Sequence, residues 1–151
     1  MSRKARLFAI SSPGGHWIQL TRLCAGLEQR YDIVYAMPDR HFQSRQSQKV
    51  YAVTDVSADD KWRLIPCALQ VLWILLKERP QAILSTGAAP GVVAILLGRL
   101  LGIRTIWVDS IANVQKISRS GELVRHRADV FLTQWEHLSD GGQVQYQGSV
   151  L

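Results

Sequence analysis

Residues 81–108 read QAILSTGAAPGVVAILLGRLLGIRTIWV, and this stretch decides the fold. The apolar runs at residues 81–85 and 104–108 are short and bounded by turn residues, which is typical of buried strands. Residues 91–101 between them have the length of a helix, and Gly102 is a common helix terminator. A strand, a helix and a second strand joined by short turns predict parallel strands with a right-handed crossover.

The rest of the chain repeats this alternation on both sides of residues 81–108. Further strands are predicted at residues 6–11, 32–37, 49–53 and 129–134, and further helices from Gly14–Gly15 to about residue 29 and over residues 62–77. Strands that are almost continuously apolar indicate a sheet with helices on both faces. The sequence therefore predicts an α/β fold, a Rossmann-like doubly wound parallel sheet in a single domain of residues 1–151.

Composition narrows the classes of function. Apolar and aromatic residues make up 47% of the chain, which excludes a disordered protein. Lys and Arg number 18 against 12 Asp and Glu, and arginine favours phosphate, so anionic partners are expected. The basic residues form no block, so nucleic acid is not expected as a partner. Cys24 and Cys67 are far apart, so neither a disulfide scaffold nor a metal site is expected, and no cofactor is predicted.

Ligands of doubly wound sheets bind at the carboxyl ends of the strands, here the loops at residues 11–16, 85–90 and 109–121. In the first loop, Gly14 and Gly15 let an anion approach the backbone at a helix N-terminus. His16 could donate a hydrogen bond to a diphosphate or act as a base on a sugar hydroxyl. The alternative is a tight turn with a solvent-facing histidine, since the full G-x-G-x-x-G motif is absent.

The second loop repeats this pattern. Ser85, Thr86 and the backbone at Gly87 could hold phosphate or sugar hydroxyls, or form an ordinary turn with Pro90 at the start of a helix.

The remaining polar candidates follow later strands. Asp109 and Ser110 could accept from a ligand hydroxyl, although an aspartate beyond a strand is more often a helix cap. Trp135, after Gln134, could stack on a ring or close the core.

Residues 62–76, WRLIPCALQVLWILL, form an unusually apolar helix. Fifteen helical residues span ~22 Å, short of the ~30 Å hydrocarbon core of a bilayer, so the helix is not expected to cross a membrane. One helix on a small sheet cannot be enclosed on every side, so its outer side should meet lipid or a partner subunit. Trp62, Trp73 and Leu76, with basic flanking residues, suit an anionic membrane surface.

Three segments together resemble a known family. They are SSPGGHWIQLTRL (residues 11–23), ERPQAILSTGAAPGVVAILLGRLLG (78–102) and IWVDSIANVQKISRSGELVRHRADVFLTQWEHL (106–138). In this order they resemble asparagine-linked glycosylation protein fourteen and its bacterial capsule and exopolysaccharide relatives. The Gly-Gly-His motif also resembles the Gly-rich loop of the lipid-linked peptidoglycan GlcNAc transferase. Trp17, Gln19, Asp109 and Asn113 depart from the family pattern.

The resemblance implies the acceptor-side half of a GT-B glycosyltransferase, an enzyme built from two Rossmann-like domains. A separate donor-binding subunit of the thirteen type would supply the half that binds the UDP-sugar. The assembled enzyme would transfer a sugar to a polyprenyl-diphosphate-linked saccharide at the cytoplasmic face of a membrane. This chain would attach peripherally and would be inactive without its partner.

On this hypothesis the candidate residues take three roles. His16 is the catalytic residue. The acceptor or its diphosphate is bound by Gly14, Gly15, Ser85, Thr86, Gly87, Asp109 and Ser110. Contacts to the acceptor or the partner chain come from Ser120, Gly121, Gln134 and Trp135.

Two other functions remain open on the sequence alone. A free-standing Rossmann oxidoreductase would need an acidic residue at the end of the second strand, and Asp39 is the nearest candidate. A non-catalytic scaffold would only tether a complete transferase to the membrane. Fold alone does not decide among these functions.

Overall fold

The predicted parallel sheet is present. A computed structural model describes residues 2–38, 48–57 and 59–150, so Asp39 lies outside the described residues. The strands pair in the order β3-β2-β1-β4-β5-β6-β7, and every pair is parallel. Their bounds are β1 Ala5–Ile10, β2 Tyr31–Met37, β3 Lys49–Ala52, β4 Ala82–Ser85, β5 Arg104–Val108, β6 Val130–Thr133 and β7 Val144–Tyr146.

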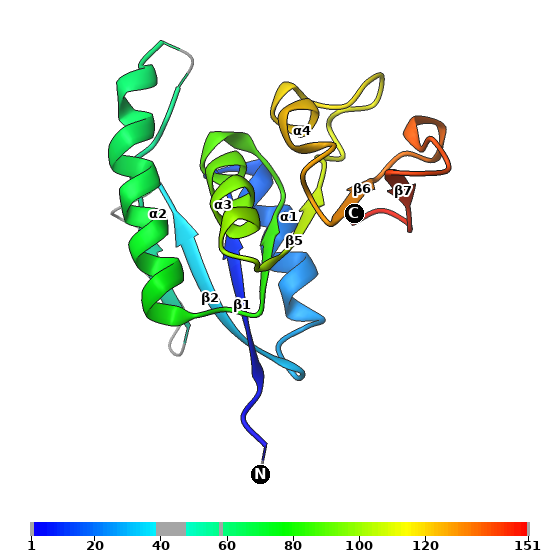
Figure 1. The fold of residues 1–151 in the computed structure, drawn as a ribbon. Coiled ribbons are helices and arrows are strands. Elements are labelled where there is room, and N and C mark those ends of the chain that lie inside the picture. Colours follow the sequence, from blue (N-terminus) through cyan, green and yellow to red (C-terminus); the bar gives the residue numbers. More distant parts are fainter. Residues whose placement is uncertain (1, 39–47, 58, 151) are drawn as a thin grey trace.

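Helices cover both faces of the sheet, as its apolar strands require (Figure 1). Leu7 and Ala9 of β1 point into a core closed by α1 (Gly15–Ala25), whereas Phe8 and Ile10 point into the core on the other face. That second face is covered by α2 (Leu64–Glu78), α3 (Ala88–Leu100) and the short α4 (Arg119–Val124). Among the described residues, two 3₁₀ turns, η1 (Lys61–Arg63) and η2 (Glu136–Leu138), complete the elements.

The predicted strands and long helices are confirmed, with shifts at their ends. The first helix stops at Ala25, four residues earlier than predicted, because the chain turns at Gly26. α3 begins at Ala88, three residues earlier than predicted, with Pro90 inside its first turn. Proline is tolerated there because the first amides of a helix have no partner within the helix. The sequence did not predict α4 or β7.

The register of the central strands brings their carboxyl ends to one edge of the sheet. Ile10 of β1 pairs with Ala36 of β2 and with Ser85 of β4, and Ser85 pairs with Trp107 of β5. The loops after β1, β4 and β5 therefore leave the sheet at the same level.

The outer side of α2 is apolar and exposed. Its inner side packs on the core through Cys67, Val71, Ile74 and Leu75. On the outer side, an apolar stripe recurs at helical spacing. The members of the stripe are Trp62, Ile65, Leu69, Trp73 and Leu76, with exposed fractions between 54% and 82%.

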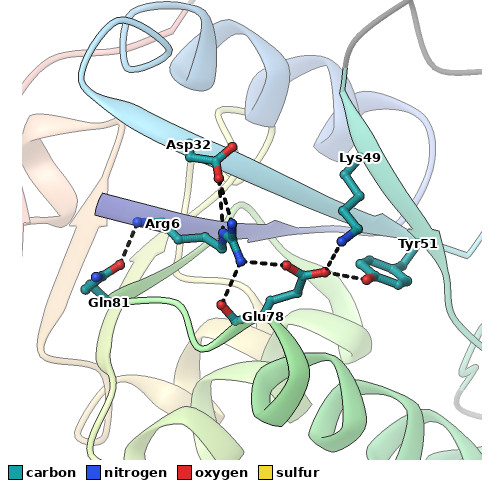
Figure 2. A network of polar contacts seen from close by, with 6 residues as sticks. All are labelled: Arg6, Asp32, Lys49, Tyr51, Glu78 and Gln81. Carbon is teal, nitrogen blue, oxygen red and sulfur yellow. Dashed lines mark hydrogen bonds and ion pairs between the residues drawn. The ribbon is translucent and has the colours of Figure 1, made fainter. Parts of the chain in front are cut away.

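The opposite edge of the sheet, where the strands begin, holds an ion cluster around the buried Glu78 (Figure 2). Glu78, at the end of α2, pairs with Arg6 of β1 at 2.9 Å and with Lys49 of β3 at 2.5 Å, and accepts a hydrogen bond from Tyr51. Burial alone would raise the pKa of Glu78. The hydrogen bonds from Lys49 and Tyr51 and the nearby positive charges outweigh burial and hold this pKa below its ordinary value.

Replacing Glu78 by glutamine is expected to lower the free energy of unfolding by about 2 kcal/mol at neutral pH, because hydrogen bonds to a charged group are lost. Since the folded-state pKa is lowered, this stabilisation is complete above the ordinary pKa of 4.5 and is lost as the pH falls through the folded-state value. Denaturant unfolding should therefore separate wild type from Glu78→Gln at pH 7 and bring them together in acid. Glu122→Gln is the control, since the Glu122 side chain is 52% exposed in its pair with Arg125. An equal loss in both variants would contradict the assignment.

Candidate functional site

The site lies where the strand order reverses. β1 is flanked by β2 and β4, so the connections after β1 and β4 diverge to opposite faces of the sheet. Such a switch point leaves space between two loops at the carboxyl ends of adjacent strands, where doubly wound sheets bind ligands. Here these loops lead into α1 and α3.

Both helices begin at this point with backbone N–H groups that no side chain caps. Their N-caps are Gly14 and Gly87, and neither helix has a side-chain cap or an acidic residue in its first turn. By contrast, Ser118 caps α4 and accepts a hydrogen bond from the amide of Gly121. A helix N-terminus without a side-chain cap offers backbone N–H groups and partial positive charge to an anion. The two α-helix N-termini are thus suited to bind one diphosphate between them.

His16 links the two loops. Its Nδ1 lies 3.1 Å from the carbonyl oxygen of Thr86, and the Thr86 hydroxyl donates a hydrogen bond to the carbonyl of His16 at 2.6 Å. Because a carbonyl oxygen can only accept, Nδ1 must carry the proton in this contact. In the neutral ring, Nε2 then holds a lone pair that is available to take a proton. The structure therefore places a partly exposed imidazole beside the helix N-termini.

Gly87 fits against His16 by having no side chain. Its φ of 150° and ψ of −179° lie in a region that is essentially restricted to glycine. A Cβ at this position would overlap the imidazole ring, with Cε1 at 2.5 Å. Gly14 also has a positive φ, 84°, but a Cβ there would meet open space.

The polar side chains of the loop after β4 already have partners within the protein, Thr86 on α1 and Ser85 within the loop. Ser85 and Thr86 are fully buried, and the Ser85 hydroxyl accepts a hydrogen bond from the amide of Gly87 at 3.2 Å. Ligand contacts from this loop would therefore come from the backbone amides at the start of α3.

Asp109 holds the loop after β5 in place. Its carboxylate accepts hydrogen bonds from Trp107 Nε1 at 3.0 Å, from Ser118 N at 3.0 Å and from Ser118 Oγ at 2.6 Å, and it is 2% exposed. Gly121 lies against this carboxylate, since a Cβ there would be 2.8 Å from Asp109 Oδ1. Ser120, in the first turn of α4, is partly exposed. The structure thus gives Asp109 a loop-closing role.

A buried amide network connects α1 to the loops after β5 and β6. Gln19 Nε2 donates to Ser110 Oγ at 3.1 Å, and Gln134 Nε2 donates to Gln19 Oε1 at 2.6 Å. Gln19 lies three residues after His16 and so shares its side of the helix. The sequence reasoning did not select Gln19, although a polar residue on the core side of an apolar helix was a usable signal. Trp135 closes the loop after β5 by donating to the carbonyl of Ile111 at 2.7 Å.

The structure therefore divides the predicted residues into three groups. The switch point brings together Gly14, Gly15, His16, Ser85, Thr86 and Gly87, whereas Asp109, Ser110, Ser120, Gly121, Gln134 and Trp135 lie in or beside the loop after β5. The third group, Trp62, Trp73 and Leu76, lies on the exposed side of η1 and α2.

This fold defines a class of protein: a Rossmann-like α/β domain of the kind that forms GT-B glycosyltransferases. MurG from Acinetobacter baumannii has a similar fold, with a TM-score of 0.79 at 13% identity over 97% of this chain and 47% of that chain. UDP-N-acetylglucosamine 2-epimerase from Rickettsia bellii gives a TM-score of 0.74 at 14% identity over 97% and 45% of the two chains. The chain thus spans about half the length of these structures, and the predicted fold class is confirmed.

The family is identified by sequence. Residues 8–150 match the family described as "Oligosaccharide biosynthesis protein Alg14 like", and the chain belongs to this family. The UDP-N-acetylglucosamine transferase subunit ALG14 of Mus musculus is 25% identical, over 89% of this chain and 77% of that protein. The subunit of the same name from Candida albicans is 36% identical over 84 residues, which cover 51% of this chain and 38% of that protein. The predicted family membership is confirmed.

Proposed function

We propose that this chain is the acceptor-binding subunit of a two-chain glycosyltransferase that acts on a polyprenyl-diphosphate-linked saccharide. The observation that carries the proposal is the convergence of two α-helix N-termini without side-chain caps, beside His16, at the switch point of one Rossmann-like sheet. That edge offers a diphosphate several backbone amides and a base at the point where a sugar hydroxyl would arrive. Membership of a family whose relatives are named as transferase subunits supports the same reading.

The partner would be a donor-binding glycosyltransferase subunit of the thirteen type. In a GT-B enzyme, the active site lies between two Rossmann-like halves, and the described residues form one sheet. The second chain would hold the UDP-sugar facing the loops after β1 and β4. An oxidoreductase is disfavoured because the first turn, Ser12–Pro13–Gly14–Gly15–His16, lacks the dinucleotide-binding pattern.

The geometry allows a direct displacement at the sugar carbon. The amides at the starts of α1 and α3 bind the acceptor diphosphate and fix the position of its saccharide. The acceptor hydroxyl attacks the anomeric carbon of the donor sugar, while His16 Nε2 takes the hydroxyl proton. The new glycosidic bond forms as the bond between the sugar and UDP breaks, and UDP leaves with the bonding electrons. His16 then returns its proton to solvent. A role as a hydrogen-bond donor to the diphosphate is the alternative for this residue.

We further propose peripheral attachment at the cytoplasmic face of the membrane, through the apolar stripe of α2. No helix in residues 2–38, 48–57 and 59–150 is long and apolar enough to cross a bilayer. The stripe is flanked by Lys61 and Arg63 at one end and by Lys77 and Arg79 at the other. Tryptophan and basic residues around an apolar helical surface are typical of an interfacial helix, and this surface would bring the site near its lipid-linked acceptor.

Reconstitution tests the proposed function. The chain alone, given a lipid-linked acceptor and a panel of UDP-sugars, is expected to show no transfer, because the described sheet offers the acceptor side only. Addition of a donor-binding second chain should restore transfer, measured by radiolabel or mass shift of the acceptor. Robust turnover by the single chain would overturn the two-chain proposal.

A further inference from the structure

A basic hollow lies at the edge of the sheet opposite the proposed active site. It has a volume of 610 Å³, and its lining includes Arg3, Lys4, Arg6, Leu76, Lys77 and Arg79. These residues come from the start of β1, the chain before it, and the end of α2. A hollow of this size is comparable to small-molecule binding sites.

The carboxylate that lines this hollow is already neutralised. Glu78, which also lines it, is paired with both Arg6 and Lys49, and Arg6 pairs in addition with Asp32 at 3.0 Å (Figure 2). Two carboxylates are therefore balanced by two cations within one cluster. Because the cluster has no net charge, it does not offset the other cations around the hollow.

Four cations remain without a counter-charge. In the part of the chain that the structure describes, none of Arg3, Lys4, Lys77 and Arg79 has a carboxylate within ion-pair distance. Lys4 donates to the backbone carbonyl of Glu28, and Lys77 lies 4.6 Å from the centre of the Trp73 ring. Unbalanced like charges gathered around a hollow create a positive potential that attracts an anion.

The backbone of Arg79 is in a strained conformation. It ends α2 with a φ of 48° and a ψ of 57°, the left-handed conformation in which helices usually place glycine. A cation is favourable at a helix C-terminus, but it could occupy an unstrained position of the last turn. Arg79 thus lines the hollow in a conformation that is strained for a residue with a side chain.

The apolar stripe indicates the kind of anion that would fit the hollow. Leu76 belongs both to the lining of the hollow and to the exposed stripe on α2, so the unbalanced cations stand at the end of an apolar surface. An anionic group joined to hydrocarbon matches this arrangement. We propose that the hollow binds the phosphate of an anionic phospholipid headgroup. This inference rests on the proposed attachment of α2 to the membrane, and it adds a specific lipid contact at the end of α2 where the chain enters β4.

The test is vesicle co-sedimentation of the full chain, with phosphatidylcholine vesicles that either lack or contain phosphatidylglycerol. The variant Arg3→Gln/Arg79→Gly removes two charges from the hollow, and glycine suits the left-handed position. The matched control Arg22→Gln/Arg30→Gln removes the same charge from α1 and the turn after it, outside the lining of the hollow. At about 1 kcal/mol per basic residue near the surface, the hollow variant should bind phosphatidylglycerol vesicles roughly 30-fold more weakly. The control should bind within about threefold of wild type.

The outcomes separate this inference from the attachment itself. Trp73→Ser/Leu76→Ser should weaken binding to both kinds of vesicle, because it removes the apolar contact. If wild type binds neutral vesicles through α2 and gains nothing from phosphatidylglycerol, the lipid contact is overturned and the attachment stands. If the hollow variant and the control lose vesicle binding equally, the attraction is a general charge effect, and the proposed lipid contact is overturned. In the reconstituted enzyme with a detergent-dispersed acceptor, the hollow variant should keep wild-type turnover, and a loss there would contradict a purely lipid-binding role.

Discussion

His16→Ala in the reconstituted two-chain enzyme is expected to lower turnover by about 100-fold or more. General-base catalysis contributes about that much, and the contact from Nδ1 to the Thr86 carbonyl leaves Nε2 as the proton acceptor. The measurement is steady-state kinetics against acceptor concentration at saturating donor. Thermal unfolding should show a loss of only about 1 kcal/mol, because one hydrogen bond of a partly exposed ring is removed.

The same experiment separates the two roles of His16. If the ring only donates a hydrogen bond to the diphosphate, the loss should appear in acceptor affinity, at about 1.5–3 kcal/mol, with turnover retained. His126→Ala is the control, since His126 is exposed near the end of α4. Kinetics unchanged from wild type would exclude both roles. A collapse in thermal stability would show that His16 belongs to the fold instead.

Much of the fold could be predicted because parallel strands carry a strong local signal. Continuous apolar runs such as residues 81–85 and 104–108 bury both faces of a strand, so they are visible without tertiary information. β7 has no such signal, since Val144 is the buried member of a three-residue strand. α4 has six residues and begins at the Ser118 cap, too short for helical periodicity to show. β7 forms by pairing with β6, and the start of α4 is held by the hydrogen bond from Ser118 to Asp109.

The convergence of the loops at the candidate site was predictable, but the direction of their side chains was not. The rule that loops gather at the carboxyl ends of parallel strands identifies Gly14, His16 and Gly87 as neighbours. Whether a hydroxyl or carboxylate faces a ligand or the protein depends on partners distant in sequence. Asp109 is bound by Ser118 nine residues away, and Gln19 meets Gln134 across the domain. No local pattern encodes such pairings.

Gly87→Ala is expected to disable the site almost as strongly as removal of His16, with a turnover loss of about 100-fold. The new methyl group would occupy the space of the His16 ring, with Cε1 at 2.5 Å, and would push the ring away from the Thr86 carbonyl. Nδ1 would lose the acceptor that fixes its proton, and Nε2 would leave its position beside the start of α1. The backbone conformation of Gly87 would add a strain of about 1–3 kcal/mol to the folded state.

A double-mutant cycle tests this explanation directly. In a His16→Ala background the ring is absent, so Gly87→Ala should cause no further loss of turnover, and its cost in unfolding free energy should fall to the backbone strain alone. Gly102→Ala is the matched control, because Gly102 also has a positive φ, 73°, while a Cβ there meets nothing within 4 Å. That variant should lose stability and keep activity. Additive losses from His16→Ala and Gly87→Ala would mean that Gly87 acts on the site independently of the histidine, through the amides at the start of α3.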